Sequence, residues 1–207
     1  ENRLKDILVK RFSLHELHSY LWQYADEYKK LGMEVVDNVK ILNATNPNIE
    51  TLRRSMVPTQ LCQVKVNSQN PDFGIFEVGR VVEGLKDNGL CNERKKLAIT
   101  LFSKTKDIKT LYLELRDILS TLTENIKHRE LSFEKAEPLH SYEHPVNLNA
   151  ICIGGNEIGS MGYACEYCEG SIHHVAPSKY LEILKLDKDN VTAKYYINKI
   201  DRKENRV

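Results

Sequence analysis

Charge of one sign, long apolar runs and a cysteine framework are all missing from this sequence. Its 30 basic residues nearly balance its 29 acidic residues, and the net charge over 207 residues is only +1. A dedicated nucleic-acid binder usually carries a strongly basic field, so RNA binding by this chain alone is not indicated. No apolar run has the length that a membrane-spanning helix needs, and we expect no membrane association.

The cysteines and the first residues predict a cytoplasmic protein. Residues 1–6 lack the basic and then apolar plan of a signal peptide. The cysteines form an odd set without the spacing of a disulfide framework, which favours reduced thiols. They are Cys62, Cys91, Cys152, Cys165 and Cys168.

The composition and the periodic patterns predict one α+β domain over residues 1–207, with a frayed tail from about 198. With 41% apolar residues, the chain can bury a substantial core. The clearest helical stripe lies in 107–125. Further helices are expected at 4–12, 25–31 and 55–67. Strands are expected at 15–21, 35–42, 73–83, 96–103, 131–136, 147–154, 157–163 and 179–186.

Local signals place two of these elements more closely. Ser55 lies near the predicted start of the helix at 55–67, and Pro58 falls in its first turn, where a missing N–H costs nothing. The polar run Asp87-Asn88-Gly89 separates the strands at 73–83 and 96–103. We expect these two strands to pair as antiparallel neighbours.

Two runs in the first half of the chain form a paired pattern. They are Asn46-Pro47 with Leu52-Arg53, Ser55 and Pro58, and then Phe76-Glu77-Val78-Gly79-Arg80. An Asn-Pro turn, a Leu-Arg strand, a Ser-x-x-Pro helix start and a Phe-Glu-x-Gly-Arg strand are similar to the synthetase-core-like module of the phenylalanyl-tRNA synthetase beta subunit. His144-Pro145 and the glycine-rich run at 154–162 follow the later half of that module, so the resemblance covers roughly residues 3–190.

This resemblance implies the core fold of a class II aminoacyl-tRNA synthetase, with an antiparallel six-stranded-type sheet flanked by helices. It also implies a non-catalytic partner of the alpha subunit in the ATP-dependent charging of tRNA with phenylalanine. ATP, Mg²⁺ and tRNA then belong to the assembly of two alpha and two beta subunits, and this segment binds no cofactor itself. The ten signature residues, which are those of the two runs without Val78, are expected to serve structure or an interface, and none is expected to be catalytic.

Two departures from an active synthetase support that expectation. In the catalytic alpha subunit the Gly-Arg-Val run is followed by an aromatic residue and an arginine that grips the ATP phosphate. The same register here gives Val82 and Glu83, which places a carboxylate at the phosphate position. A Gly-x-Gly-x-Gly-x-x-Arg run is also absent from the sequence. Adenylate formation by this chain alone is therefore not expected.

The charged signature residues have structural interpretations. Arg53 and Arg54 are adjacent on a predicted strand and should point to opposite faces. For these arginines, an ion pair or a hydrogen bond to a loop carbonyl is favoured over contact with a partner chain or RNA. Glu77 and Arg80 are three residues apart, so each is expected to find a partner on a neighbouring strand rather than to pair with the other.

Cys165 and Cys168 are the residues that most resemble a metal site. Two thiolates at this spacing could bind one zinc ion with His173. The neighbouring His174 is poorly placed to join the same ion, and the second half of a zinc finger is missing. We favour a loop pair without metal, and structural zinc and a redox dithiol are the alternatives.

Two other functions compete with the synthetase module. One is a free-standing binding module of the same fold, which would bind a small molecule or another protein. The other is an independent enzyme that works through Cys165 and Cys168. A chain without its partner should expose an apolar patch or form a homodimer.

Overall fold

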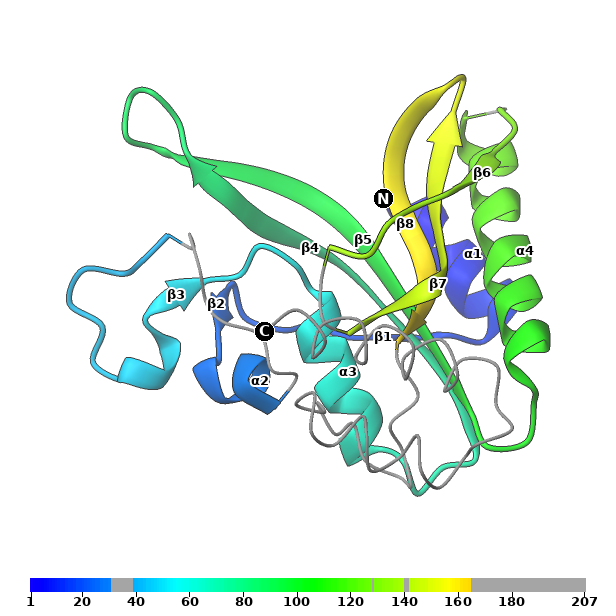
Figure 1. The fold of residues 1–207 in the computed structure, drawn as a ribbon, viewed down its shortest axis with the longest axis horizontal. Helices are drawn as coiled ribbons and strands as arrows, with labels where there is room; N and C mark the ends of the chain where they lie inside the picture. The colour runs from blue at the N-terminus through cyan, green and yellow to red at the C-terminus, as the bar shows by residue number, and fades with distance from the viewer. Residues whose placement is uncertain (31–38, 128, 140–141, 165–207) are drawn as a thin grey trace, which may run out of the picture.

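The computed structural model describes residues 1–30, 39–127, 129–139 and 142–164 (Figure 1). The helices in these ranges are α1 (Asn2–Phe12), α2 (Ala25–Lys30), the 3₁₀ helix η1 (Pro47–Ile49), α3 (Val57–Val66) and α4 (Ile108–Lys127). The strands are β1 (His15–Glu16), β2 (Trp22–Gln23), β3 (Thr51–Leu52), β4 (Asp72–Leu85), β5 (Cys91–Ser103), β6 (Ser132–Lys135), β7 (Glu143–Ile153) and β8 (Asn156–Ala164).

The described strands form three sheets, and the α+β class is confirmed. The first sheet has the order β1-β4-β5, the second pairs β2 with β3, and the third has the order β6-β7-β8. Every pairing is antiparallel except that of β1 with β4, which is parallel. The resemblance implied one six-stranded-type sheet, whereas the described strands are divided among three.

The long hairpin of β4 and β5 is the centre of the fold. Its strands pair without interruption from Asp72 opposite Ser103 to Val82 opposite Glu93. Gly89 at its turn has a φ of +77°, a conformation that glycine adopts without a steric penalty. The predicted pairing is confirmed, but β5 begins at Cys91 rather than at residue 96. The charged residues 93–96 are exposed because this end of the hairpin projects into solvent, and they therefore show no burial pattern.

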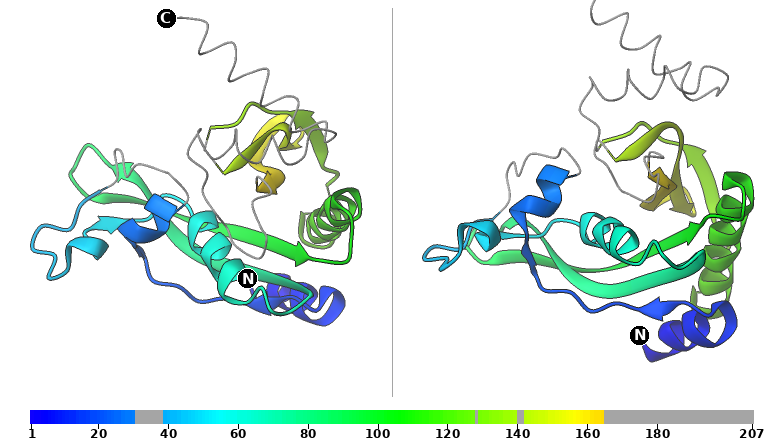
Figure 2. Two further views of the ribbon diagram at one scale, coloured as in Figure 1. Left: turned by 60° about the horizontal axis from the view of Figure 1, so that its bottom comes forward. Right: turned by 90° about the horizontal axis from the view of Figure 1, so that it is seen from below.

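One face of this hairpin packs on α1 and α4. Leu8 of α1, Phe76 of β4, and Ile118 and Leu122 of α4 are buried in one apolar cluster. The periodic apolar residues that predicted both helices are the ones that contact this cluster, since residues three or four apart share a helix face. Figure 2 shows α1 and α3 on opposite sides of β4 and β5.

The other face of the hairpin is covered by α3 and the segment before it. Met56, Val81 and Ala98 form a second buried cluster there. Ser55 lies just before α3 and its Oγ accepts the Val57 N–H at 3.2 Å, while Pro58 is in the first turn. The predicted start of this helix is therefore confirmed, and the polar residues next to it become buried against the sheet.

Two predicted strands differ from the structure, and a third cannot be compared with it. The strand expected at 15–21 ends at Glu16, because the chain then crosses to pair Trp22 with Leu52. Of the strand expected at 35–42, the described part shows only an isolated bridge between Lys40 and Thr51. The strand expected at 179–186 lies outside the described residues. No helix in the described ranges combines the length and apolar character that crossing a membrane requires.

Candidate functional site

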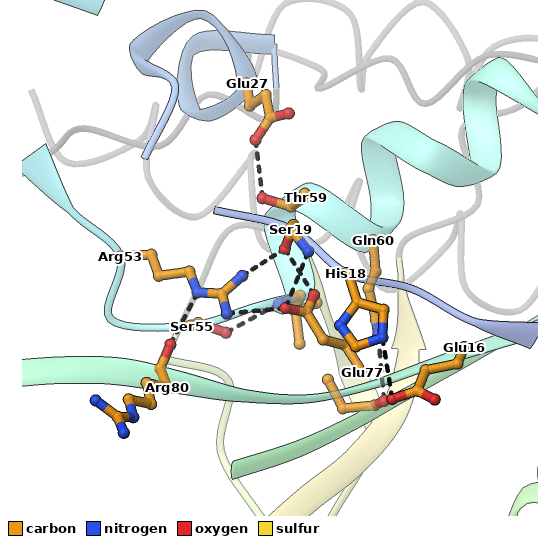
Figure 3. Close-up of polar contacts among 12 residues, drawn as sticks. Glu16, His18, Ser19, Glu27, Arg53, Ser55, Thr59, Gln60, Glu77 and Arg80 are labelled. Atoms are coloured by element: carbon orange, nitrogen blue, oxygen red, sulfur yellow. Dashed lines mark hydrogen bonds and ion pairs between the residues drawn. The ribbon is translucent and has the colours of Figure 1, made fainter. Parts of the chain in front are cut away.

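A buried ion pair joins the two signature runs. Arg53 follows β3 directly and Glu77 lies in β4, and the Arg53 Nη2 is 2.9 Å from the Glu77 Oε1 (Figure 3). Both side chains are only 3% exposed. An ion pair removed from water is stable only when its remaining hydrogen-bonding groups are also satisfied.

Ser19 and the backbone of Arg80 complete this pair. The Ser19 hydroxyl donates to Glu77 Oε2 at 2.7 Å and accepts a hydrogen bond from Arg53 Nη1. The Arg53 Nε donates to the Arg80 carbonyl at 2.9 Å. Three groups, two on β4 and one on the segment between β1 and β2, thus hold one guanidinium inside the protein. We call Ser19, Arg53 and Glu77 the buried polar cluster.

Gly79 provides the space for this cluster. A Cβ atom at residue 79 would lie 2.5 Å from Arg53 Nη2, 2.7 Å from the Met56 sulfur and 2.9 Å from Glu77 Oε1. These separations are shorter than real Cβ contacts, so a side chain would displace the ion pair. The Glu-x-Gly spacing of the second run therefore has a steric reason in this structure.

The remaining residues of the second run have different surroundings. Phe76 is fully buried in the apolar cluster that β4 forms with α1 and α4. The Arg80 side chain is exposed and forms an ion pair with Glu93 of β5 at 3.1 Å. The prediction of a partner on a neighbouring strand is confirmed for Arg80, whereas Glu77 pairs with Arg53 in the segment that follows β3, a strand of another sheet. Arg53 is buried and Arg54 exposed, which matches the expected opposite directions.

The residues of the first run shape the turn that leads into β3. The Asn46 side-chain oxygen accepts the Asn48 N–H at 2.9 Å, and Pro47 begins η1. Asn48 in turn accepts the Asp26 N–H at 3.0 Å, which links the turn to α2. Leu52 pairs with Trp22 across the two-stranded sheet. These contacts hold the segment that delivers Arg53 to the buried polar cluster.

Glu83 lies further along β4 beside two cations of β5. Its carboxylate is 2.7 Å from the Lys96 Nζ and 3.6 Å from the Arg94 Nε. The hydrogen bond from Lys96, together with the positive charges of Lys96, Arg94 and Arg54, lowers the pKa of Glu83. The carboxylate is thus ionised and neutralises part of a basic surface.

Two residues of this region had no sequence motif. Ser19 lies in an irregular segment, where a lone serine carries no pattern. Gln60 of α3 is fully buried; its amide N–H donates to the Ala98 carbonyl at 3.1 Å and its amide oxygen accepts the Thr100 hydroxyl at 2.7 Å. Gln60 shares a helix face with Met56 and Val64, and that spacing could have indicated its burial.

The predicted metal-ligating residues cannot be compared with the structure. Cys165, Cys168 and His173 all lie outside the described residues, and the expectation of a loop pair without metal stays a prediction. Within the described ranges, no three His, Cys, Asp or Glu residues come together in a way that could hold a metal ion.

Comparisons with known proteins agree on one family. The family model described as the phenylalanyl tRNA synthetase beta chain CLM domain matches residues 1–164. The phenylalanine–tRNA ligase beta subunits of two Leptospira biflexa serovar Patoc strains are each 26% identical over 168 residues, which cover 78% of this chain and 21% of the relative. The chain therefore spans about a fifth of the length of these relatives.

A solved structure extends the likeness to the fold. The pyrrolysyl tRNA synthetase PylSc of Desulfitobacterium hafniense superposes with a TM-score of 0.56 at 16% identity. The match covers 77% of this chain and 55% of that one. At this identity the likeness shows the class II synthetase fold and nothing about the site.

Proposed function

We propose that this chain, which belongs to the phenylalanyl-tRNA synthetase beta chain CLM domain family, is the non-catalytic structural partner of the alpha subunit in the ATP-dependent charging of tRNA with phenylalanine. The observation that carries the proposal is the carboxylate of Glu83 at the expected phosphate position. Glu83 is ion-paired with Lys96 and Arg94, so these cations are already partly neutralised.

The negative charge of Glu83 disfavours a phosphate at this position. An arginine at this position would attract an ATP phosphate, whereas a carboxylate repels it. At contact distance the repulsion is on the order of 1 to 4 kcal/mol at watery to intermediate effective dielectric. A phosphate would also have to compete with Glu83 for Lys96. ATP binding in the manner of an active synthetase is therefore disfavoured.

The buried polar cluster is a second argument for the same proposal. The Arg53 guanidinium binds Glu77, Ser19 and the Arg80 carbonyl inside the protein, where a ligand has no access to it. The signature arginine thus has an architectural role that joins β3 to β4. Its positive charge is satisfied inside the fold, which leaves the guanidinium without a role in substrate binding under this proposal.

The substrates and cofactors are proposed for the whole assembly. Since this chain corresponds to about a fifth of its relatives, ATP, Mg²⁺, phenylalanine and tRNA are assigned to the complete enzyme and none to this segment. A cytoplasmic location also stays a prediction. The free-standing binding module is the alternative that the following experiment can detect.

Mixing the purified chain with the alpha subunit from the same organism tests the partnership. We expect the two proteins to co-elute in size-exclusion chromatography, with a mass by light scattering that exceeds that of either protein alone. Absence of co-elution at micromolar concentrations of both proteins would contradict the proposal and favour the free-standing binding module.

Calorimetric titration with ATP and Mg²⁺ tests the lack of a nucleotide site. No heat of binding is expected for this chain, and the alpha subunit in the same buffer serves as the positive control. Micromolar affinity for ATP would overturn the argument from Glu83.

A further inference from the structure

A cavity of about 420 Å³ lies at the base of the β4–β5 hairpin, at the end opposite its turn. The first residues of β4 and the last residues of β5 line it from the hairpin, and the end of α1 and the first half of α4 line it from the helices. Figures 1 and 2 show both helices beside this end of the hairpin. Small-molecule sites usually measure roughly 300 to 1,000 Å³, so this cavity has room for a small ligand.

Aromatic and aliphatic side chains form the walls of the cavity. Phe73 and Phe102 are cross-strand neighbours, and their ring centroids are 5.1 Å apart. Phe12 lines the cavity at the end of α1, and Leu111 and Ile118 line it from α4. The three phenylalanines are only partly buried, so they still present apolar surface. A flat apolar group can pack against these rings.

The charged side chains around the cavity are more acidic than basic. Three acidic and two basic side chains line it, which gives a net charge of −1, and they are Asp72, Glu114, Asp117, Arg11 and Lys106. The Lys106 Nζ is 2.8 Å from a carboxylate oxygen of Glu114, so this pair neutralises itself. Two carboxylates then remain against one guanidinium.

The two remaining carboxylates differ in their partners. Asp72 accepts hydrogen bonds from the hydroxyl groups of Ser103 and Thr105, and these hydrogen bonds lower the pKa of its carboxyl. For Asp117 we find neither an ion pair nor a hydrogen bond of the side chain in the part of the chain that the structure describes. Asp117 is therefore the carboxylate of the lining that is available to a ligand.

The remaining basic group, Arg11, already has an aromatic partner. Its Cζ lies over the Phe12 ring at 5.4 Å from the ring centroid. Such a cation–π contact is favourable for the guanidinium and shows that the faces of these rings can accept a positive charge.

We infer that this cavity binds a small organic cation, with the ammonium group of the ligand beside Asp117 and its flat apolar body against Phe73 and Phe102. Aromatic faces attract cations as well as apolar groups, so both parts of such a ligand find partners in the lining. An anion of the same shape would meet a net negative lining. This inference goes beyond the proposed function and does not depend on the alpha subunit. It gives the chain a ligand site apart from Glu83 and from the buried polar cluster.

Phenethylamine and 3-phenylpropionate test the inference, because they share a phenyl ring and two methylene groups but carry opposite charges at neutral pH. Each compound is titrated into the nitrogen-15-labelled chain, and binding is followed by the amide chemical shifts. For phenethylamine we expect saturable shifts at residues 72–74, 101–102 and 111–118, with a Kd of about 1 mM or below. 3-Phenylpropionate should bind at least roughly fivefold more weakly.

The variant Asp117→Asn tests the ionic contact, and Glu124→Gln is its matched control. Both changes remove one exposed carboxylate from α4 with little change of shape, but Glu124 does not line the cavity. The Kd for phenethylamine should rise roughly threefold to fivefold in Asp117→Asn, which is the upper range for an exposed ion pair. In Glu124→Gln it should stay at the wild-type value.

Several results would show the inference to be wrong. They are the lack of saturable shifts at roughly 20 mM phenethylamine, shifts that map away from the cavity, and binding of 3-phenylpropionate that is equal or tighter. An unchanged Kd in Asp117→Asn, or an equal rise in Glu124→Gln, would likewise contradict it. The proposed partnership with the alpha subunit is tested separately by co-elution and stands or falls without this site.

Discussion

Gly79 and Arg53 share one space: a methyl group on the glycine would lie 2.5 Å from the arginine guanidinium. Gly79 lies in β4 and Arg53 directly after β3, and they are 26 residues apart in the chain. Their relationship explains why a glycine follows Glu77 at this spacing. It also makes the stability of the fold sensitive to a single added carbon atom.

We expect Gly79→Ala to destabilise the protein by about 2 to 4 kcal/mol, because the methyl group displaces a buried ion pair. Urea unfolding measures the change. Gly159→Ala is the matched control, since the nearest atom to its added Cβ is 4.0 Å away. Equal stability of the two variants would show that the cluster can move aside without cost.

Arg53→Lys should destabilise the protein by about 2 to 3 kcal/mol although it keeps the charge. A lysine cannot donate to Glu77, Ser19 and the Arg80 carbonyl with the geometry of a guanidinium. The adjacent Arg54→Lys is the control and should change stability by less than about 0.5 kcal/mol, because Arg54 is exposed. Similar effects of the two changes, measured by urea unfolding, would remove the special role given to Arg53.

His144 should make the protein less stable as the pH falls below 6.5. Burial lowers the pKa of this histidine, and its Nδ1 accepts the Asn147 N–H at 3.0 Å, which requires an unprotonated Nδ1. Between the folded pKa and the ordinary value of 6.5, the unfolded chain binds more protons, so stability rises with pH in that window.

Unfolding free energies at pH 7.5, 6.5 and 5.5 test this dependence. The loss on acidification should be smaller in His144→Gln than in wild type. His15→Gln changes an exposed histidine and should leave the dependence of the wild type in place. A His144→Gln variant with the full dependence would assign the effect to another group.

Glu83 should cause a second loss of stability on acidification, at a lower pH than that of His144. Its hydrogen bond with Lys96 lowers the pKa of the carboxyl, so the contribution is complete above the ordinary value of 4.5 and is lost as the pH falls through the folded pKa. We expect less than about 1 kcal/mol, because the side chain is partly exposed. Between pH 5 and pH 3, the melting temperature should fall less steeply for Glu83→Gln than for wild type.

The periodic elements could be predicted from sequence because their burial follows their geometry. Ile118 and Leu122 recur at helical spacing in α4, and both lie in the apolar cluster. The strand predicted at 15–21 was too long, because a pattern of seven residues does not show where the chain leaves one sheet for another. Residues 93–95 of β5 were left out of the predicted strand for a different reason. They are exposed, so their side chains do not alternate between apolar and polar.

The buried polar cluster was only partly accessible to sequence reasoning. Strand geometry indicated that Arg53 and Glu77 would have structural partners, and the signature placed them on different strands. Their mutual pairing depends on how β3 approaches β4, which no local pattern encodes. Ser19 has no motif at all, and the need for Gly79 becomes visible only when the positions of the neighbouring atoms are known.

The register shift between Val82 and Leu85 has a consequence for the faces of the hairpin end. Two residues of β4, Glu83 and Gly84, lie opposite one residue of β5, and Gly84 has a φ of +140°. Side chains alternate along a strand, so a single inserted residue reverses which face the following side chains occupy. Deleting Gly84 would turn Leu85 to the other face of the hairpin without altering the composition of its tip. A one-residue deletion would then exchange the side chains on the two faces of this end of the hairpin, whereas a substitution would change a single side chain.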